Sequence, residues 1–526
     1  MPKNTFLAFL NHSILTAGLW ALTGLASAVD SVPSAQFDVF EYRVLGNSVL
    51  ANREIETVLY PLLGEHKTLA DVEVARAILE KYYHERGYGT VFVDIPEQEV
   101  NEKIVRLKVT EGRLHEVHIA GARYFSERKI MAGIPAAAAG SVPNLPALQQ
   151  QLATVNLQSG DRSVVPVLKA GALPGTVDLA LKVDDHSPFH GSIEVNNQNT
   201  PNTKPLRSTL SMSYNNFFQD FDSLSMQYQI APQEINQVNV FAANYAWGAF
   251  PGGLRPSMYF INSNSSVATV GTIGVLGKGQ ILGARLGVPI GSVPNSQAIT
   301  FGIDYKHFRE TIGLVGIPAL VTPISYVNLS AGYTGRWEAD PWVGSLGVTA
   351  NFGPRGAPNN SYAFANKRYR GQANYFYLKL DSSLGVRLPQ GFQLVLRADG
   401  QMAVEPLITN ENYTITGADG VRGYREAEVL ADTGLKGSLQ LQSPIVRWHE
   451  LSVGDAFVFY DIGRADAIDP LQGEVGSTVL RSLGAGLHLF PGRSFSGMFT
   501  LADPLRDGPN TRRGHPKILF TIRGAF

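Results

Sequence analysis

The residues of this chain that could carry catalysis form no familiar catalytic motif. Gly277-Lys278-Gly279 has glycine after the lysine, where a phosphate-binding loop needs serine or threonine, and it lacks the upstream glycine. His84-Glu85 is not followed by the second histidine of a zinc-binding H-E-x-x-H motif, and no G-x-S-x-G elbow occurs. The 526 residues contain no cysteine, which excludes thiolate metal sites and cysteine nucleophiles. We therefore expect no enzymatic reaction, no cofactor and no metal site.

Composition also narrows the possible partners. The 44 basic and 45 acidic residues give a formal net charge of -1 and are mixed along the chain. A nucleic-acid-binding protein needs a basic surface, and no such footprint is visible. We expect neither nucleic acid nor a nucleotide as a partner.

Two short segments combine a charged side chain with glycine and aromatic residues. The first lies in the longest break of the late strand pattern and reads Gly420-Val421-Arg422-Gly423-Tyr424-Arg425. The second, Phe459-Tyr460-Asp461-Ile462-Gly463, lies on a predicted strand, whose period of two puts Phe459 and Asp461 on one side. A guanidinium is always charged and can hold a carboxylate by two hydrogen bonds, and glycine permits a tight turn.

The elements that must position these segments are β-strands. From Phe189 to Phe526 the hydrophobic period is two, with turns rich in Gly, Pro, Asn and Asp, and we count about sixteen candidate strands, an even number typical of bacterial barrels. A soluble β-sandwich or propeller shows the same alternation with its apolar face inwards. Strands of about ten residues, aromatic residues near strand ends and the export signal described next favour a transmembrane barrel.

The N-terminus has the features of an export signal. Lys3 precedes an apolar stretch from Ile14 to Leu25, and Ala26-Ser27-Ala28 fits the small-x-small cleavage rule. The stretch is too short to cross a bilayer of roughly 30 Å, which disfavours a membrane anchor. We expect residues 1–28 to be a signal peptide and Val29 to begin the mature chain.

Between these regions the chain contains an internal repeat. Residues 44–55 align without gaps on residues 119–130, and the alignment matches three pairs of identical residues: Gly46 with Gly121, Arg53 with Arg128, and Ile55 with Ile130. This pattern predicts a strand ending at a glycine, followed by a helix with its arginine exposed and its isoleucine buried.

Each repeat continues in the order helix, strand, strand. In the first, Thr68-Leu69-Ala70-Asp71 is a capping box, and a helix with apolar Val72, Ala75, Leu79 and Tyr82 follows to Gly87. Its strands are expected at 90–95 and 103–110. In the second, helices are expected from Ser126 and over 145–157, with strands at 117–120, 163–168 and 177–183.

The repeated βααββ unit resembles the POTRA domain, and the run from Pro166 to Leu179 resembles the second POTRA domain of two-partner secretion transporters of the FhaC, ShlB and HecB type. The Val421-Arg422-Gly423-Tyr424 segment resembles the tip of the sixth extracellular loop of that family. The segments Phe459-x-Asp461-x-Gly463 and Gly434-Leu435-Lys436-Gly437 resemble its wall-strand motif and its glycine-rich strand. These motifs occur here in the family's order.

The resemblance implies an architecture. It comprises α+β POTRA domains at 37–112 and 113–185, and an all-β transmembrane barrel of about sixteen antiparallel strands at 189–526. The loop at 403–430 is expected to fold into the lumen, where Arg422 contacts Asp461. The terminal aromatic Phe526, in phase with Ile518, Phe520 and Ile522, resembles the assembly signal of outer-membrane barrels.

The resemblance also implies a function. The POTRA domains capture an unfolded partner in the periplasm, where an exposed edge strand can pair with an extended segment, and the barrel exports it. The expected partners are a large β-helical exoprotein, outer-membrane lipid and the barrel-assembly machinery. A barrel assembly or insertion factor and a solute channel remain as alternatives, and for the POTRA unit the alternative to capture is a plain folding module or spacer.

One feature of FhaC-like relatives is not expected. Those relatives carry an N-terminal plug helix, whereas only Val29 to Gln36 separates the expected cleavage site from the first strand. We therefore expect the Arg422 loop alone to occupy the lumen.

Overall fold

The computed structural model describes residues 35–526 except 101, 266, 271–272, 291–294, 313–319, 357, 449–450 and 493. The expected signal peptide, the mature start at Val29 and the segment bearing on a plug helix lie before the described residues. The chain divides into two compact units. One contains the first repeat with residues 139–147 and 169–178, and the other contains 117–138, 148–168 and 179–526.

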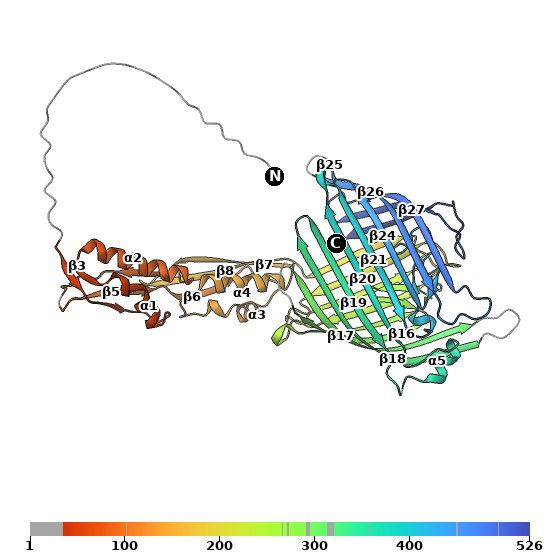
Figure 1. Ribbon diagram of the computed structural model, residues 1–526, viewed down its shortest axis with the longest axis horizontal. Helices are drawn as coiled ribbons and strands as arrows, with labels where there is room; N and C mark the ends of the chain where they lie inside the picture. Colours follow the sequence, from red (N-terminus) through yellow and green to blue (C-terminus); the bar gives the residue numbers. More distant parts are fainter. Residues whose placement is uncertain are drawn as a thin grey trace, which may run out of the picture. The chain divides into compact units, whose positions relative to one another are not determined.

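The first repeat folds into a three-stranded sheet covered by two helices (Figure 1). The sheet order is β2-β5-β4, with β2 parallel to β5 and β4 antiparallel to it. A short pair, β1 with β3, was not predicted. The elements are β1 (Phe37–Val39), β2 (Glu41–Leu45), α1 (Asn52–Leu59), η1 (Tyr60–Leu62), β3 (Gly64–Lys67), α2 (Leu69–Glu85), β4 (Val91–Asp94) and β5 (Ile104–Glu111).

Helix α2 begins at the predicted capping box. Asp71 accepts hydrogen bonds from the backbone N–H and the hydroxyl of Thr68, each at 2.7 Å, and these bonds lower the pKa of Asp71. The helix buries Val72, Ala75 and Leu79 as expected. Tyr82 was expected on this face and is only partly buried. The buried tyrosine is Tyr83, because the helix continues its stripe by a step of four from Leu79.

The second repeat builds a sheet of the same kind, in the order β6-β8-β7. Helix α4 occupies the predicted residues, and α3 starts one residue after Ser126. The elements are β6 (Arg113–Ala120), α3 (Glu127–Ala132), η2 (Pro135–Ala137), α4 (Leu145–Leu157), β7 (Arg162–Ala170) and β8 (Thr176–Asp185).

The matched glycines occupy equivalent positions in the two repeats. Gly46 has φ +90° and Gly121 has φ +96°, directly after β2 and β6. A Cβ atom on Gly46 would lie 2.4 Å from the Val109 carbonyl oxygen, and one on Gly121 would lie 2.3 Å from that of Val183. Both positions therefore require glycine for conformation and for space. The matched arginines are exposed and the matched isoleucines are buried, as the repeat predicts: Arg53, Arg128, Ile55 and Ile130.

Among the described residues after β8, sixteen strands form a closed antiparallel barrel (Figure 1). Pairing of β29 with β9 closes it. A short additional strand, β25 (Val446–Trp448), pairs with β26. The sixteen strands are β9 (Phe189–Asn196), β10 (Arg207–Asn215), β11 (Ser223–Ile230), β12 (Asn239–Ala246), β13 (Arg255–Ser263), β16 (Gly279–Pro289), β17 (Ser296–Ile312), β18 (Leu320–Ala339), β19 (Trp342–Phe352), β20 (Phe376–Arg387), β21 (Gln393–Ala403), β24 (Thr433–Gln442), β26 (Leu451–Asp466), β27 (Ser477–Leu489), β28 (Phe495–Pro504) and β29 (Lys517–Ala525).

The alternation along each strand separates an apolar outer wall from a polar lumen. On β17, Phe301, Ile303 and Tyr305 are about half exposed on the outer face, whereas Asp304 is 4% exposed and points inwards. A soluble sandwich or propeller would bury the apolar set instead, so the closed barrel and this orientation decide against that alternative. No helix in the described ranges is long and apolar enough to cross a membrane.

Substituting Gly121→Ala should destabilise the second small domain by roughly 1–3 kcal/mol, because alanine at this φ is strained and its Cβ meets the Val183 carbonyl. The urea concentration at which a protease begins to cut this domain in the full-length protein should fall. Gly160→Ala is the matched control, since its Cβ meets nothing within 4 Å. Equal protease resistance of the two variants would contradict the structural role of Gly121.

Candidate functional site

The longest loop of the barrel joins β21 to β24 and folds into the lumen; we call residues 404–432 the lumenal loop. It contains η5 (Thr409–Glu411) and a two-stranded pair, β22 (Tyr413–Thr414) with β23 (Leu430–Ala431). Its tip is buried against β26 and β27 in one apolar cluster, formed by Ile415, Val421, Tyr424, Val429, Ala431, Ala465 and Leu480.

Arg422 at the tip binds Asp461 on the wall. The guanidinium donates from Nε to Oδ2 and from Nη2 to Oδ1, both at 2.8 Å, and the backbone N–H of Arg422 donates to Oδ2 at 3.1 Å. Gln440 and Ser438 on β24 accept the remaining guanidinium hydrogen bonds at 3.0 Å. Asp461 is fully buried and Arg422 is 9% exposed. The contact is therefore a buried bidentate ion pair, in which four of the five guanidinium N–H groups have a protein acceptor.

The wall motif, Phe459-x-Asp461-x-Gly463, forms the surface on which this pair lies. The Phe459 ring lies under the guanidinium, with its centroid 3.4 Å from Cζ of Arg422. Gly463 faces the same loop, since a Cβ atom there would lie 2.8 Å from Cγ2 of Val421. Each residue of the wall motif serves the loop differently: Phe459 stacks on the guanidinium, Asp461 binds it as an ion pair, and Gly463 leaves room for Val421.

The other residues of the loop motif complete the contact. Gly423 has φ +94°, and a Cβ atom there would lie 3.2 Å from the Ala502 carbonyl oxygen. The Tyr424 hydroxyl lies 3.1 Å from the carbonyl oxygen of Arg481 and 2.8 Å from that of Arg506. The motif therefore touches β27, β28 and the following loop as well as β26.

The two glycines of the glycine-rich strand differ in how closely other residues approach them. A Cβ atom on Gly434 would lie 2.7 Å from the Tyr413 ring of the loop, so glycine is needed there for close approach. Gly437 has no neighbour closer than 3.7 Å to such an atom, and nothing in the structure requires glycine at that position.

Two further carboxylates hold the loop, and sequence reasoning missed both. Glu428 accepts from the backbone N–H of Arg425 and of Asn510 and from the Thr511 hydroxyl. Asp432 accepts from the backbone N–H of Leu407 at 2.8 Å and of Ile468 at 2.7 Å. These bonds join distant loops, and the sequence carried no periodic signal that could have revealed them.

A second loop packs on the same apolar cluster as the start of the lumenal loop. Helix α5 (Ser361–Lys367) places Phe364 5.3 Å from the lumen-facing ring of Tyr326, in one cluster with Leu407 and Ile408. The expectation that the Arg422 loop alone, without an N-terminal helix, occupies the lumen stays a prediction, because the N-terminal residues that bear on it lie before the described residues.

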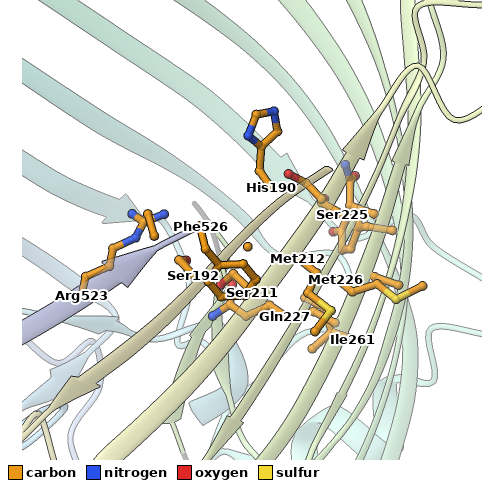
Figure 2. Close-up of a pocket in the computed structure, with 17 residues that line it drawn as sticks. His190, Ser192, Ser211, Met212, Ser225, Met226, Gln227, Ile261, Arg523 and Phe526 are labelled. Atoms are coloured by element: carbon orange, nitrogen blue, oxygen red, sulfur yellow. The ribbon is translucent and has the colours of Figure 1, made fainter. Parts of the chain in front are cut away.

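Phe526 lies at the seam where β29 closes on β9. Its backbone N–H donates to the Gly191 carbonyl and its own carbonyl accepts from Gly191, both at 2.9 Å. Its ring borders a cavity of about 740 Å³ that Figure 2 shows together with His190, Ser192 and Arg523. The structure thus brings the loop and wall motifs together, whereas Phe526 lies at the seam and the matched repeat residues lie in the two small domains.

Two family models and a curated relative match this chain. The model of the POTRA domain, ShlB-type, matches residues 37–112, and the model of the haemolysin secretion/activation protein ShlB/FhaC/HecB matches residues 175–489. The heme/hemopexin transporter protein HuxB of Haemophilus influenzae is 21% identical over 491 residues, which cover 91% of this chain and 85% of HuxB.

Solved structures agree on the architecture. CdiB from Escherichia coli superposes with a TM-score of 0.61 at 19% identity, covering 96% of this chain and 93% of that one. BamA from Haemophilus ducreyi lacking POTRA domains 1–3 superposes with a TM-score of 0.57 at 12% identity, covering 93% and 100% of the two chains. At these identities the superpositions show the fold alone.

Substituting Arg422→Ala should destabilise the barrel by up to roughly 3–5 kcal/mol, because it leaves a buried aspartate unpaired. The double variant Arg422→Ala/Asp461→Ala should lose less than the sum of the single variants. The urea midpoint of the heat-modifiable gel mobility of the barrel measures both. Arg464→Ala is the control, since its pair with Asp466 is exposed and should contribute at most about 1 kcal/mol. Additive losses would show that Arg422 and Asp461 are not coupled.

Proposed function

The chain belongs to the ShlB/FhaC/HecB family of haemolysin secretion/activation proteins, and on that premise we propose how its parts divide the work of export. It is a two-partner secretion transporter of the outer membrane, with POTRA domains in the periplasm and a barrel through which a partner protein passes. We assign residues 37–112 and 113–185 to two POTRA domains and residues 189–526 to the barrel, with the loop at 403–430 as its gate.

Capture is the task we propose for the small domains. The outer strands are β2 and β4 in the first sheet and β6 and β7 in the second. Side chains of α2 already bond the outer edge of β4 at Val93, and Asn156 of α4 bonds that of β7 at Val164. The loop at 140–141 bonds the start of β6 at Leu114, so we propose β2 as the main edge for capture. An extended segment of an unfolded passenger can add to such an edge through backbone hydrogen bonds, which need no particular side chains. This mode fits a partner that arrives without a fold.

Gating is the task we propose for the lumenal loop, and the buried pair of Arg422 and Asp461 carries this proposal. The pair fixes the tip of the loop across the interior of the barrel, where a passenger must pass. Opening the path therefore requires the guanidinium to leave the carboxylate. The step needs no covalent chemistry, and we propose export without an enzymatic reaction, a nucleotide or a cofactor.

The remaining partners follow from the same reading. We propose that the passenger is a large β-helical exoprotein, that outer-membrane lipid covers the apolar wall, and that Phe526 is read by the barrel-assembly machinery during biogenesis. The likeness to BamA concerns the fold, so it does not favour a function in barrel assembly. No observation in the described residues favours a solute channel.

Arg422→Ala and Asp461→Ala should each reduce delivery of the passenger to the cell surface by about tenfold or more, because the gate loses its defined closed state. Secreted passenger is measured by immunoblot of the medium, and barrel assembly by heat-modifiable mobility of the same cells. Arg464→Ala should secrete normally, since its partner Asp466 lies two residues along the same strand. Normal secretion by both variants, with assembled barrels, would remove the assigned role of the pair.

Deleting residues 37–110 should abolish export while the barrel still reaches the outer membrane, because the deletion removes the first capture domain and leaves β9 to β29 intact. Passenger retained in the periplasm is the measured product. Undiminished secretion by this variant would show that the first POTRA domain is only a spacer.

A further inference from the structure

A second buried ion pair holds the lumenal loop at its other end. Glu411, the last residue of η5, is 4% exposed, and its Oε1 accepts from Nζ of Lys306 at 2.6 Å and from the hydroxyl of Tyr326. Its Oε2 accepts from the hydroxyl of Tyr377 at 2.6 Å. We call Glu411 with Lys306, Tyr326 and Tyr377 the Glu411 latch.

The three partners of Glu411 come from three different wall strands. Lys306 lies on β17, Tyr326 on β18 and Tyr377 on β20. Asp461 and the other partners of Arg422 lie on β24 and β26. The loop is therefore attached to one group of wall strands at Glu411 and to another group at its tip, Arg422.

The charge on Lys306 is committed to Glu411. The neighbouring lumenal carboxylate, Asp304, already has a cation of its own, since Arg285 donates to its two oxygens at 2.5 and 2.9 Å. Asp304 also accepts from the Tyr259 hydroxyl at 2.6 Å. Lys306 and Glu411 are therefore ion-pair partners, and separating them breaks a buried salt bridge.

Apolar packing surrounds the latch and excludes water from it. Tyr375 stacks on Tyr377 with ring centroids 5.9 Å apart, and Phe364 of α5 packs on Tyr326. Leu407 and Ile408, just before η5, are each 1% exposed. A hydrogen-bonded charge in such surroundings contributes more than one in water, so this contact holds the leg of the loop in place.

The C-terminal part of the loop, which ends at Asp432, is bonded to the same side chain of β21 as Glu411. Nε2 of Gln401 on β21 donates to the carbonyl of Glu411 at 2.9 Å and to that of Asp432 at 3.1 Å. Gln401 therefore joins the two legs where the loop enters and leaves the lumen. The tip beyond them is held separately by Arg422.

We propose that Glu411 is a positioning residue for the gate, which fixes the N-terminal leg of the loop to the wall so that full opening requires release of both Glu411 and Arg422. The inference rests on the proposed gating by this loop and adds a second, independent point of attachment. Breaking one attachment frees one end of the loop, and the other end stays docked.

The absence of cysteine makes the two ends separately measurable. Ile408→Cys reports on the leg and Val421→Cys on the tip, because both side chains are almost fully buried. The purified full-length protein, in detergent and without passenger, is labelled with a water-soluble maleimide. Glu411→Gln should raise the labelling rate at position 408 by about tenfold and leave position 421 unchanged, since it removes a charge-assisted contact. Arg422→Gln should do the reverse.

Single-channel recording in a planar lipid bilayer gives the second readout. The Glu411→Gln/Arg422→Gln double variant should show frequent large open events, and each single variant should show few. Glu405→Gln is the matched control, because it lies in the same loop and its carboxylate accepts only a 3.3 Å bond from the Phe376 backbone among the bonds described. If Glu411→Gln fails to assemble, Tyr377→Phe removes one donor to the carboxylate and keeps the ring.

Wild-type labelling at both positions in assembled Glu411→Gln and Tyr377→Phe would overturn the proposal. Equal increases at both positions in Glu411→Gln would also overturn it, because the loop would then be held as one piece. Neither result depends on the passenger. A failure of the gating function would instead appear as normal secretion by the Arg422 and Asp461 variants, whatever the labelling shows.

Discussion

A guanidinium and a carboxylate buried together inside the barrel determine the course of the loop that fills it. A buried charge is tolerated only when it is paired and hydrogen-bonded, so Arg422 can be buried in the lumen only where Asp461 pairs with it. The nearby residues follow from that contact. The Phe459 ring lies under the guanidinium, Gly463 makes room for Val421, and Gly423 turns the chain towards β28.

The closed barrel supplies the place where such a pair can exist. Side chains along each strand alternate between the two faces, so the pattern that turns Ile303 and Tyr305 outwards also turns Asp304 and Lys306 inwards. Loops then enter the lumen and bury some of its polar groups. Inward-facing polar groups must bind one another, and Lys306 does so with Glu411. The alternation of apolar outer residues and polar inner residues is a local property of each strand, so it could be predicted from the sequence.

Properties that depend on local patterns were predicted well, and properties that depend on distant partners were not. Helix α4 and the matched positions of the repeat follow from periodicity and alignment, and the contact of Arg422 with Asp461 was expected from the resemblance. The prediction that Tyr82 is buried was wrong by one residue, since Tyr83 is the buried tyrosine. Steps of three and of four residues from Leu79 both stay on the same face of a helix, so the sequence pattern did not distinguish the two. Glu411 could not be found, since its partners lie on three strands whose relative register the sequence does not state.

Carboxylates fix irregular segments throughout this protein. Glu111 accepts from the backbone N–H of Ser48 and Val49, and Asp185 accepts from three successive backbone N–H groups at the equivalent turn of the second repeat. An irregular segment leaves such donors unpaired, and an ionised carboxylate can accept several at once. Glu428 and Asp432 do the same for the lumenal loop. A carboxylate contact of this kind can be exchanged for water one hydrogen bond at a time, at a net cost of about 1 kcal/mol for a neutral bond and more for a charged one. Attachment by carboxylates therefore suits the gating that we propose, in which the loop is ordered at rest and is released without unfolding the wall around it.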